Sequence, residues 1–179
     1  MNNLYIPRRL ENELCTAVQE FPVVIITGPR QSGKSTLLRH LFTTKTYTTL
    51  DDPFQRKLAL EDPRMFLENA GESAVIDEIQ YAPDLLSYIK MEVDNHREQT
   101  GRYILTGSQH FPLMQNISES LAGRAAIYEL LPFGWKEARL STTLHVSEFF
   151  DVLFHGFYPD PLIHGVERNR YYSSYLRSY

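Results

Sequence analysis

The sequence contains a single cysteine, Cys15, in 179 residues and therefore cannot form an internal disulfide. This scarcity fits the reducing environment of the cytoplasm, where we expect the protein to be located. We expect Cys15 itself to be a small buried residue in a helix. The sequence also has no run of about 18 apolar residues, and its first residues lack the apolar stretch of a signal peptide. We therefore expect neither a membrane span nor a signal peptide.

Patterns typical of zinc and guanine-nucleotide sites are also absent. The six histidines are scattered, without H-E-x-x-H or paired cysteines, which argues against a zinc site. No N-K-x-D pattern is present, so a GTPase is not indicated. The net charge of -4 gives no support to a nucleic-acid surface that covers the protein, although a local basic patch stays open. With 42% hydrophobic residues, the composition is that of an ordinary globular protein.

The sequence does contain a phosphate-loop pattern. Residues 28–35, GPRQSGKS, fit G-x-x-x-x-G-K-S/T. A β-branched run at residues 23–27 precedes the loop, and a helical segment at residues 36–41 follows it. Glycines allow successive main-chain N–H groups to face one anion, and the positive end of the following helix adds to the attraction. The alternative is a glycine-rich turn from strand to helix that binds nothing.

Two side chains of this loop suit a nucleotide and its metal. Lys34 supplies a cation for the β- and γ-phosphates of ATP, and the Ser35 hydroxyl suits Mg²⁺. The predicted nucleotide-binding residues are Gly28, Pro29, Arg30, Gln31, Ser32, Gly33, Lys34, Ser35 and Thr36. Segments just before such a loop often lie near the base, so Tyr5, Ile6 and Arg8 are candidate neighbours of adenine. The alternative for these three residues is ordinary packing of an N-terminal arm.

Two adjacent carboxylates, Asp77 and Glu78, end the apolar run at residues 74–76. Ligands bind beyond the carboxyl ends of parallel strands, so the pair should emerge beside the phosphate loop. Because neighbouring strand residues point to opposite sides, we expect Asp77 to face the Mg²⁺ held by Ser35. Glu78 then faces the attacking water and acts as a general base. The alternatives are a polar strand end and a helix N-cap.

Ser108 and Gln109 follow the next apolar strand, at residues 103–106. A polar residue at this point of a nucleotide hydrolase contacts the γ-phosphate or its water. Ser108 is the first candidate for this sensor and Gln109 the second. The alternative is a simple turn built from glycine and serine.

Arg124 lies just before the last predicted strand, at residues 125–130. An arginine finger supplies positive charge during phosphoryl transfer and is worth about 10³–10⁵ in rate. A finger at the amino end of a strand would reach the nucleotide of a neighbouring subunit, so we expect a homo-oligomer with Arg124 acting in trans. The alternatives are a solvated arginine and a salt bridge.

The rest of the pattern predicts further elements around these motifs. They are helices at residues 7–21, 53–60, 63–70, 82–101, 111–120 and 146–154, a strand at 46–50, and a turn-rich loop at 155–161. Asp51 or Asp52 should cap the helix at residue 53, with an acid–base or metal role as the alternative. The aromatic stripe at residues 171–179 either packs back on the domain or needs a partner or further chain to cover it.

Five motifs in this order resemble prokaryotic AAA-type ATPases of the group whose C-terminal half is a domain of unknown function. The motifs are GPRQSGKS at 28–35, LDDP at 50–53, AVIDEIQ at 74–80, YILTGSQ at 103–109 and SLAGRAAIYELLPF at 120–133. The resemblance implies Walker A residues Lys34 and Ser35, Walker B residues Asp77 and Glu78, a sensor at Ser108 or Gln109, and Arg124 as the candidate finger. Members usually continue into a second domain, so the resemblance also implies a C-terminal domain outside this sequence.

We therefore expect an α/β fold of the AAA-type P-loop NTPase class. A five-stranded parallel sheet with a central P-loop strand and helices on both faces should form a core at residues 1–131, with a helical extension at 132–179. The expected function is Mg²⁺-dependent ATP binding and hydrolysis that drives a partner or the C-terminal domain. The alternative is an ATP-binding switch or interaction module with little hydrolysis. A small-molecule kinase is disfavoured because no arginine-rich lid is evident.

Overall fold

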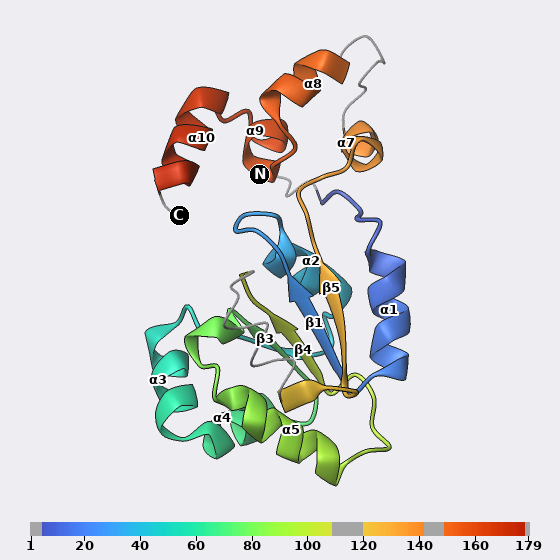
Figure 1. Cartoon of the computed structure of the whole chain (residues 1–179), viewed down its shortest axis with the longest axis vertical. Helices are drawn as coiled ribbons and strands as arrows, with labels where there is room; N and C mark the ends of the chain where they lie inside the picture. Colours follow the sequence, from blue (N-terminus) through green and yellow to red (C-terminus); the bar gives the residue numbers. More distant parts are fainter. Residues whose placement is uncertain (1–4, 109–119, 142–148, 178–179) are drawn as a thin grey trace.

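The computed structural model describes residues 5–108, 120–141 and 149–177, and its centre is a parallel sheet (Figure 1). The strands are β1 (Val23–Thr27), β2 (Thr46–Thr49), β3 (Ala74–Asp77), β4 (Tyr103–Thr106) and β5 (Ala125–Glu129). They run in the order β2-β3-β4-β1-β5, and every neighbouring pair is parallel. The predicted five-stranded parallel sheet is confirmed. The P-loop strand β1 was expected at the centre and lies between β4 and β5, one place from the edge of the sheet.

Helices cover both faces of this sheet, as predicted (Figure 1). One face carries α1 (Glu11–Glu20) and α2 (Lys34–Leu41), and the other carries α3 (Pro53–Glu61), α4 (Pro63–Ala70) and α5 (Leu85–Asn95). Strand β1 supplies both cores, because Val24 and Ile26 join the α1–α2 side while Val23 and Ile25 join the other. Burial on both faces explains why β1 is apolar without interruption.

Among the described residues, four helices follow β5 and lie beyond the carboxyl ends of the strands (Figure 1). They are α7 (Trp135–Ser141), α8 (Phe149–His155), α9 (Pro159–Ile163) and α10 (Arg168–Arg177). The tyrosines of α10 pack back on the domain: Tyr171 is only 7% exposed, and the rings of Tyr171 and Tyr175 both contact Tyr158. The Tyr171 hydroxyl donates a hydrogen bond to the Gln31 side chain, at 2.8 Å. The division at residues 131 and 132 stays a prediction.

Three sequence-based expectations were wrong. Helix α5 ends at Asn95 and not at Gly101. Gly101 has φ 61° and its N–H donates to the Phe21 carbonyl at 2.7 Å, so this glycine forms a turn against the end of α1. The expected loop at 155–161 contains the start of α9, where Pro159 begins the helix. Cys15 is exposed. The helix expected at 111–120 lies almost entirely outside the described residues.

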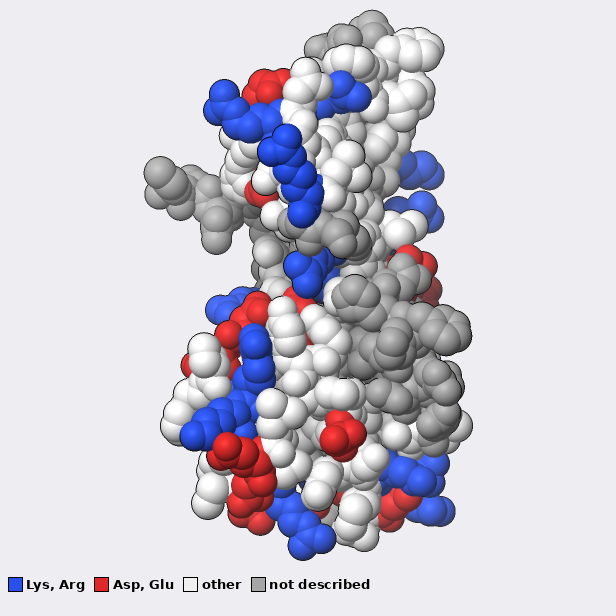
Figure 2. Space-filling model, turned by 60° about the vertical axis from the view of Figure 1, so that its left-hand side comes forward, with Lys and Arg blue, Asp and Glu red and all other residues white. Residues whose placement is uncertain are grey.

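Basic and acidic side chains are interspersed over the core on the face shown in Figure 2. In the three described ranges, every helix is too short or too polar to cross a bilayer.

The tyrosine packing gives a stability prediction. Tyr171→Ala should lower the free energy of unfolding by about 3 kcal/mol, because it removes a buried aromatic ring and the contact with Gln31. Urea denaturation measures the effect. Leu176→Ala, in the same helix but 74% exposed, is the control and should change stability by less than about 0.5 kcal/mol. Equal effects of the two substitutions would contradict the docking of α10 on the core.

Candidate functional site

The phosphate loop connects the end of β1 to the start of α2 and depends on two glycines. Gly28 has φ 140°, and a Cβ at this position would lie 2.3 Å from the carbonyl oxygen of Leu130. Gly33 has φ 96° and occupies the N-cap of α2. Neither position accepts a side chain without strain, so the glycines of the pattern are required by the backbone. Helix α2 directs its N-terminus, with its positive dipole end, at this loop.

Lys34 begins α2 and extends back over the loop. Its side chain is almost fully buried, and its ammonium donates hydrogen bonds to the carbonyls of Gly28 at 3.0 Å and Pro29 at 2.9 Å. The cation is therefore held inside the loop by the main chain. An anion placed on the loop would meet this ammonium together with the N–H groups of the α2 terminus.

A cleft of about 640 Å³ lies against the loop. Its lining comes from five parts of the chain. The loop and α2 supply Gln31, Gly33, Lys34, Ser35, Thr36, Leu37, Arg39 and His40, the N-terminal arm supplies Tyr5, Ile6 and Arg8, and the rest are Glu78, Phe133, Pro159, Asp160, Ile163 and His164. Its volume is in the range of small-molecule sites. A second cleft, of about 570 Å³ between α4 and α5, contains no predicted site residue.

The two carboxylates at the end of β3 have different environments. Asp77 is 3% exposed, and the hydroxyls of Tyr47 and Thr106 each donate to one of its carboxylate oxygens. Burial, followed by the hydrogen bond to Asp77, raises the pKa of Tyr47 to about 12, so this phenol stays a donor. Glu78 lines the cleft. Asp77 is not among the residues that line it. Glu78 has φ 62° and lies outside β3, so the predicted alternation along an extended strand does not describe this pair.

Sequence reasoning missed three residues that hold these carboxylates. Tyr47 and Thr106 contact Asp77. The Gln80 amide donates to the Glu78 carboxylate and accepts from the main-chain N–H of Ser108 at 3.3 Å. Gln80 belongs to the AVIDEIQ motif, which was the available signal for it. Nothing in the threonine-rich segment around Tyr47 indicated its role, since the contact joins residues 30 positions apart.

The structure describes Ser108, the first sensor candidate, but not the second. Ser108 lies just after β4, beside the loop strand, and is 2% exposed. Among the described residues its hydroxyl has no hydrogen-bond partner. Gln109 lies outside the described residues.

Arg124 lies at the amino ends of the strands, just before β5, whereas Lys34 lies beyond the carboxyl end of β1. Its guanidinium makes a two-point ion pair with Asp94 of α5, at 2.8 and 3.0 Å. The hydrogen bonds from Arg124 lower the pKa of the Asp94 carboxyl. Within one chain Arg124 is therefore remote from the cleft, and a role as a finger stays a prediction that concerns a neighbouring subunit.

Asp52 caps α3 through the Phe54 N–H, as expected.

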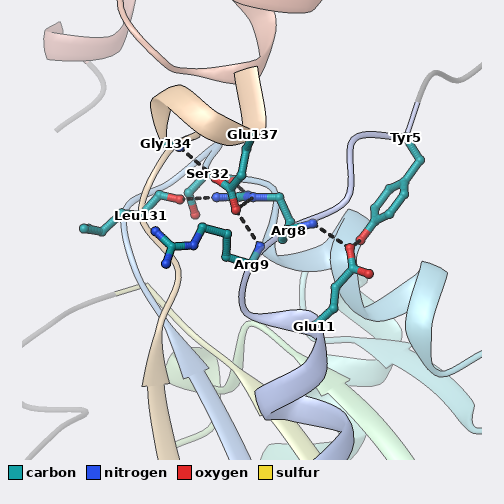
Figure 3. Close-up of polar contacts among 8 residues, drawn as sticks. All are labelled: Tyr5, Arg8, Arg9, Glu11, Ser32, Leu131, Gly134 and Glu137. Atoms are coloured by element: carbon teal, nitrogen blue, oxygen red, sulfur yellow. Dashed lines mark hydrogen bonds and ion pairs between the residues drawn. The ribbon is translucent and has the colours of Figure 1, made fainter. Parts of the chain in front are cut away.

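A buried network ties the N-terminal arm to the loop and to α7 (Figure 3). Arg8 donates to the carbonyls of Ser32 at 3.0 Å and Leu131 at 2.6 Å, and its Nε lies 3.3 Å from Glu137. Glu137 also accepts from the N–H groups of Arg9 and Gly134, both at 2.7 Å. Burial alone would raise the pKa of Glu137, but these N–H groups and Arg8 outweigh it and lower that pKa.

This network predicts a pH-dependent loss of stability. Because the folded-state pKa of Glu137 is below its ordinary 4.5, its contribution is present above about pH 4.5 and disappears as the carboxylate is protonated. Glu137→Gln should therefore cost about 3 kcal/mol at neutral pH, since it leaves Arg8 buried without its anion, and much less in strong acid.

Urea denaturation across this pH range measures the effect, with exposed Glu61→Gln as the control. A cost of Glu137→Gln that does not depend on pH would contradict the ion pair.

Two relatives of this chain match part of it and are much longer than it is. Uncharacterized protein Rv2008c of Mycobacterium tuberculosis and uncharacterized protein Mb2031c of Mycobacterium bovis are each 37% identical to it over 116 residues. The matched region covers 64% of this chain but 26% of each relative. The chain thus spans about a quarter of the length of these relatives.

Solved structures share the fold at low sequence identity. The Walker-type ATPase PABY2304 of Pyrococcus abyssi aligns with a TM-score of 0.58 and 20% identity, over 97% of this chain and 72% of that one. The signal transduction ATPase PH0952 of Pyrococcus horikoshii, which has a tetratricopeptide repeat sensor, aligns with a TM-score of 0.52 and 16% identity, over 89% and 29%. A family model described as an AAA domain matches residues 20–139. Since this match covers well over half of the sequence, the chain belongs to the AAA domain family.

Proposed function

We propose that the protein binds ATP with Mg²⁺ at the phosphate loop and hydrolyses it. The observation that carries this proposal is that Lys34, Ser35 and Glu78 line one cleft, although Glu78 is more than 40 positions away in the sequence. A cation for phosphate, a hydroxyl for a metal and a carboxylate for water are the groups that phosphoryl transfer to water requires.

The residues present fit Mg²⁺. The proposed donors, the Ser35 hydroxyl and the Asp77 carboxylate, are hard oxygen ligands, and Mg²⁺ is usually held by one or two such groups together with substrate phosphates. Tyr47 and Thr106 fix the orientation of Asp77 in advance. When bound, the metal neutralises charge on the phosphates.

Each remaining group then has a specific task. The loop, residues 28–36, holds the phosphates, and Lys34 turns its ammonium from the loop carbonyls to the β- and γ-phosphates. Glu78 accepts a proton from the attacking water. Ser108 offers its buried hydroxyl to the γ-phosphate or that water. Tyr5, which stacks on His40 with ring centroids 3.6 Å apart, and Ile6 border the adenine.

Hydrolysis would be coupled to the rest of the protein through the helical extension. Helix α9 contributes Asp160 and Ile163 to the cleft, and Tyr171 of α10 contacts Gln31 in the loop. Nucleotide binding therefore changes groups that the extension contacts directly. The load is a protein partner or a C-terminal domain of the kind that the greater length of the relatives supports. The second candidate is an ATP-binding switch with little turnover, which the pairing of Arg124 with Asp94, away from the cleft, favours.

Two substitutions separate binding from turnover. Lys34→Ala should weaken ATP binding and abolish hydrolysis, because the loop loses its cation. Glu78→Gln should keep ATP binding and lower turnover by at least about 100-fold, because the base is lost.

Binding of a fluorescent ATP analogue and release of phosphate measure the two effects. Glu129→Gln, a carboxylate outside the cleft lining, is the control. Tight binding with no phosphate release by the unsubstituted protein would favour the switch, and unchanged hydrolysis in Glu78→Gln would overturn the assignment of the base.

We propose in addition that Arg124 acts on the nucleotide of a neighbouring subunit in a homo-oligomer. Turnover per subunit should then rise with protein concentration, and Arg124→Ala should remove this rise, with a loss of up to about 10³-fold. Asp94→Asn is the matched control, since it breaks the same ion pair but keeps the arginine. A rate independent of concentration, or equal losses in both variants, would show a structural ion pair only.

A further inference from the structure

Gln80 makes two hydrogen bonds that join separate parts of the site. It belongs to the short 3₁₀ helix η1 (Ile79–Tyr81), two residues after Glu78. Its Nε2 donates to the Glu78 carboxylate, and its Oε1 accepts from the Ser108 N–H at 3.3 Å. A primary amide is the side chain with a donor and an acceptor at one planar end, and this orientation is the one that satisfies both neighbours.

The main chain around Glu78 gives this contact a purpose. Glu78 has φ 62°, a left-handed conformation that is unfavourable for a non-glycine residue. Its N–H donates to the Thr106 hydroxyl at 3.3 Å, which is the same hydroxyl that donates to Asp77. The main chain of Glu78 is thus fixed by β4, but its carboxylate has rotatable bonds of its own. Gln80 donates a hydrogen bond to that carboxylate and so restrains it.

Resting on the proposed function, we propose that Gln80 is a positioning residue for hydrolysis. It holds the Glu78 carboxylate in the cleft and links it to Ser108, so that the base and the residue beside the γ-phosphate move together. The hydrogen bond removes rotational freedom from the carboxylate before ATP arrives. Misplacement of a catalytic group by about 1 Å costs about 100-fold in rate, which sets the scale of the effect.

Two substitutions separate the two bonds. Gln80→Ala removes both, whereas Gln80→Glu keeps an acceptor for Ser108 but replaces the donor with a second carboxylate beside Glu78. Both variants should lower kcat by about 10-fold to 100-fold, while the Kd of a fluorescent ATP analogue changes by less than about twofold. Gln19→Ala, an exposed glutamine in α1, should change neither quantity.

The decisive measurement is the double variant Glu78→Gln with Gln80→Ala. If Gln80 acts through Glu78, its removal should not reduce the residual rate of Glu78→Gln any further. Additive losses, or weaker ATP binding in Gln80→Ala, would overturn the proposal and indicate a structural role. An unchanged kcat in Gln80→Ala, with Glu78→Gln inactive, would refute this inference alone. A wild-type protein without turnover would refute the proposed function and this inference with it.

Discussion

Strand β1 is buried on both faces, and the positions of the other strands and of the loop follow from this burial. Val23, Val24, Ile25 and Ile26 have no exposed surface, and the strand is hydrogen-bonded to β4 on one side and β5 on the other. Such a strand presents polar groups only where it ends. The phosphate loop begins there, and β3 and β4 place Asp77, Glu78 and Ser108 along the same edge because all strands are parallel.

Polar groups gathered at one buried edge must satisfy each other. Asp77 receives two hydroxyls, and Glu78 is held by its main chain and by Gln80. On the opposite side of the loop, the Arg8–Glu137 pair joins the N-terminal arm to α7. These bonds give the edge its geometry before any ligand arrives, which is the preorganisation that charge stabilisation in catalysis requires. The helical extension contacts the same loop through the hydrogen bond from Tyr171 to Gln31.

The fold was predictable because its strongest features are local. The run at 23–27 forms β1, the glycine pattern leads into α2, and Asp77 ends β3. Each of these features depends on neighbours in sequence, and the roles expected for the carboxylates at 77 and 78 stay predictions. The errors arose where contacts between distant residues decide. Gly101 packs against α1 rather than ending α5. A salt bridge was one alternative for Arg124, but its partner Asp94 is 30 positions away and could not be named from the sequence. Tyr47 and Gln80 escaped notice because their roles lie in such contacts.

We propose that the carboxyl ends of the strands bind Mg²⁺-ATP and direct a water at its γ-phosphate. A crystal structure with Mg²⁺ and a non-hydrolysable ATP analogue tests this claim most directly. We expect the triphosphate over residues 28–36, the metal between Ser35 and Asp77, and a water held by Glu78 beside the γ-phosphate. A nucleotide bound elsewhere, such as the cleft between α4 and α5, or a Glu78 carboxylate turned out of the cleft would contradict it.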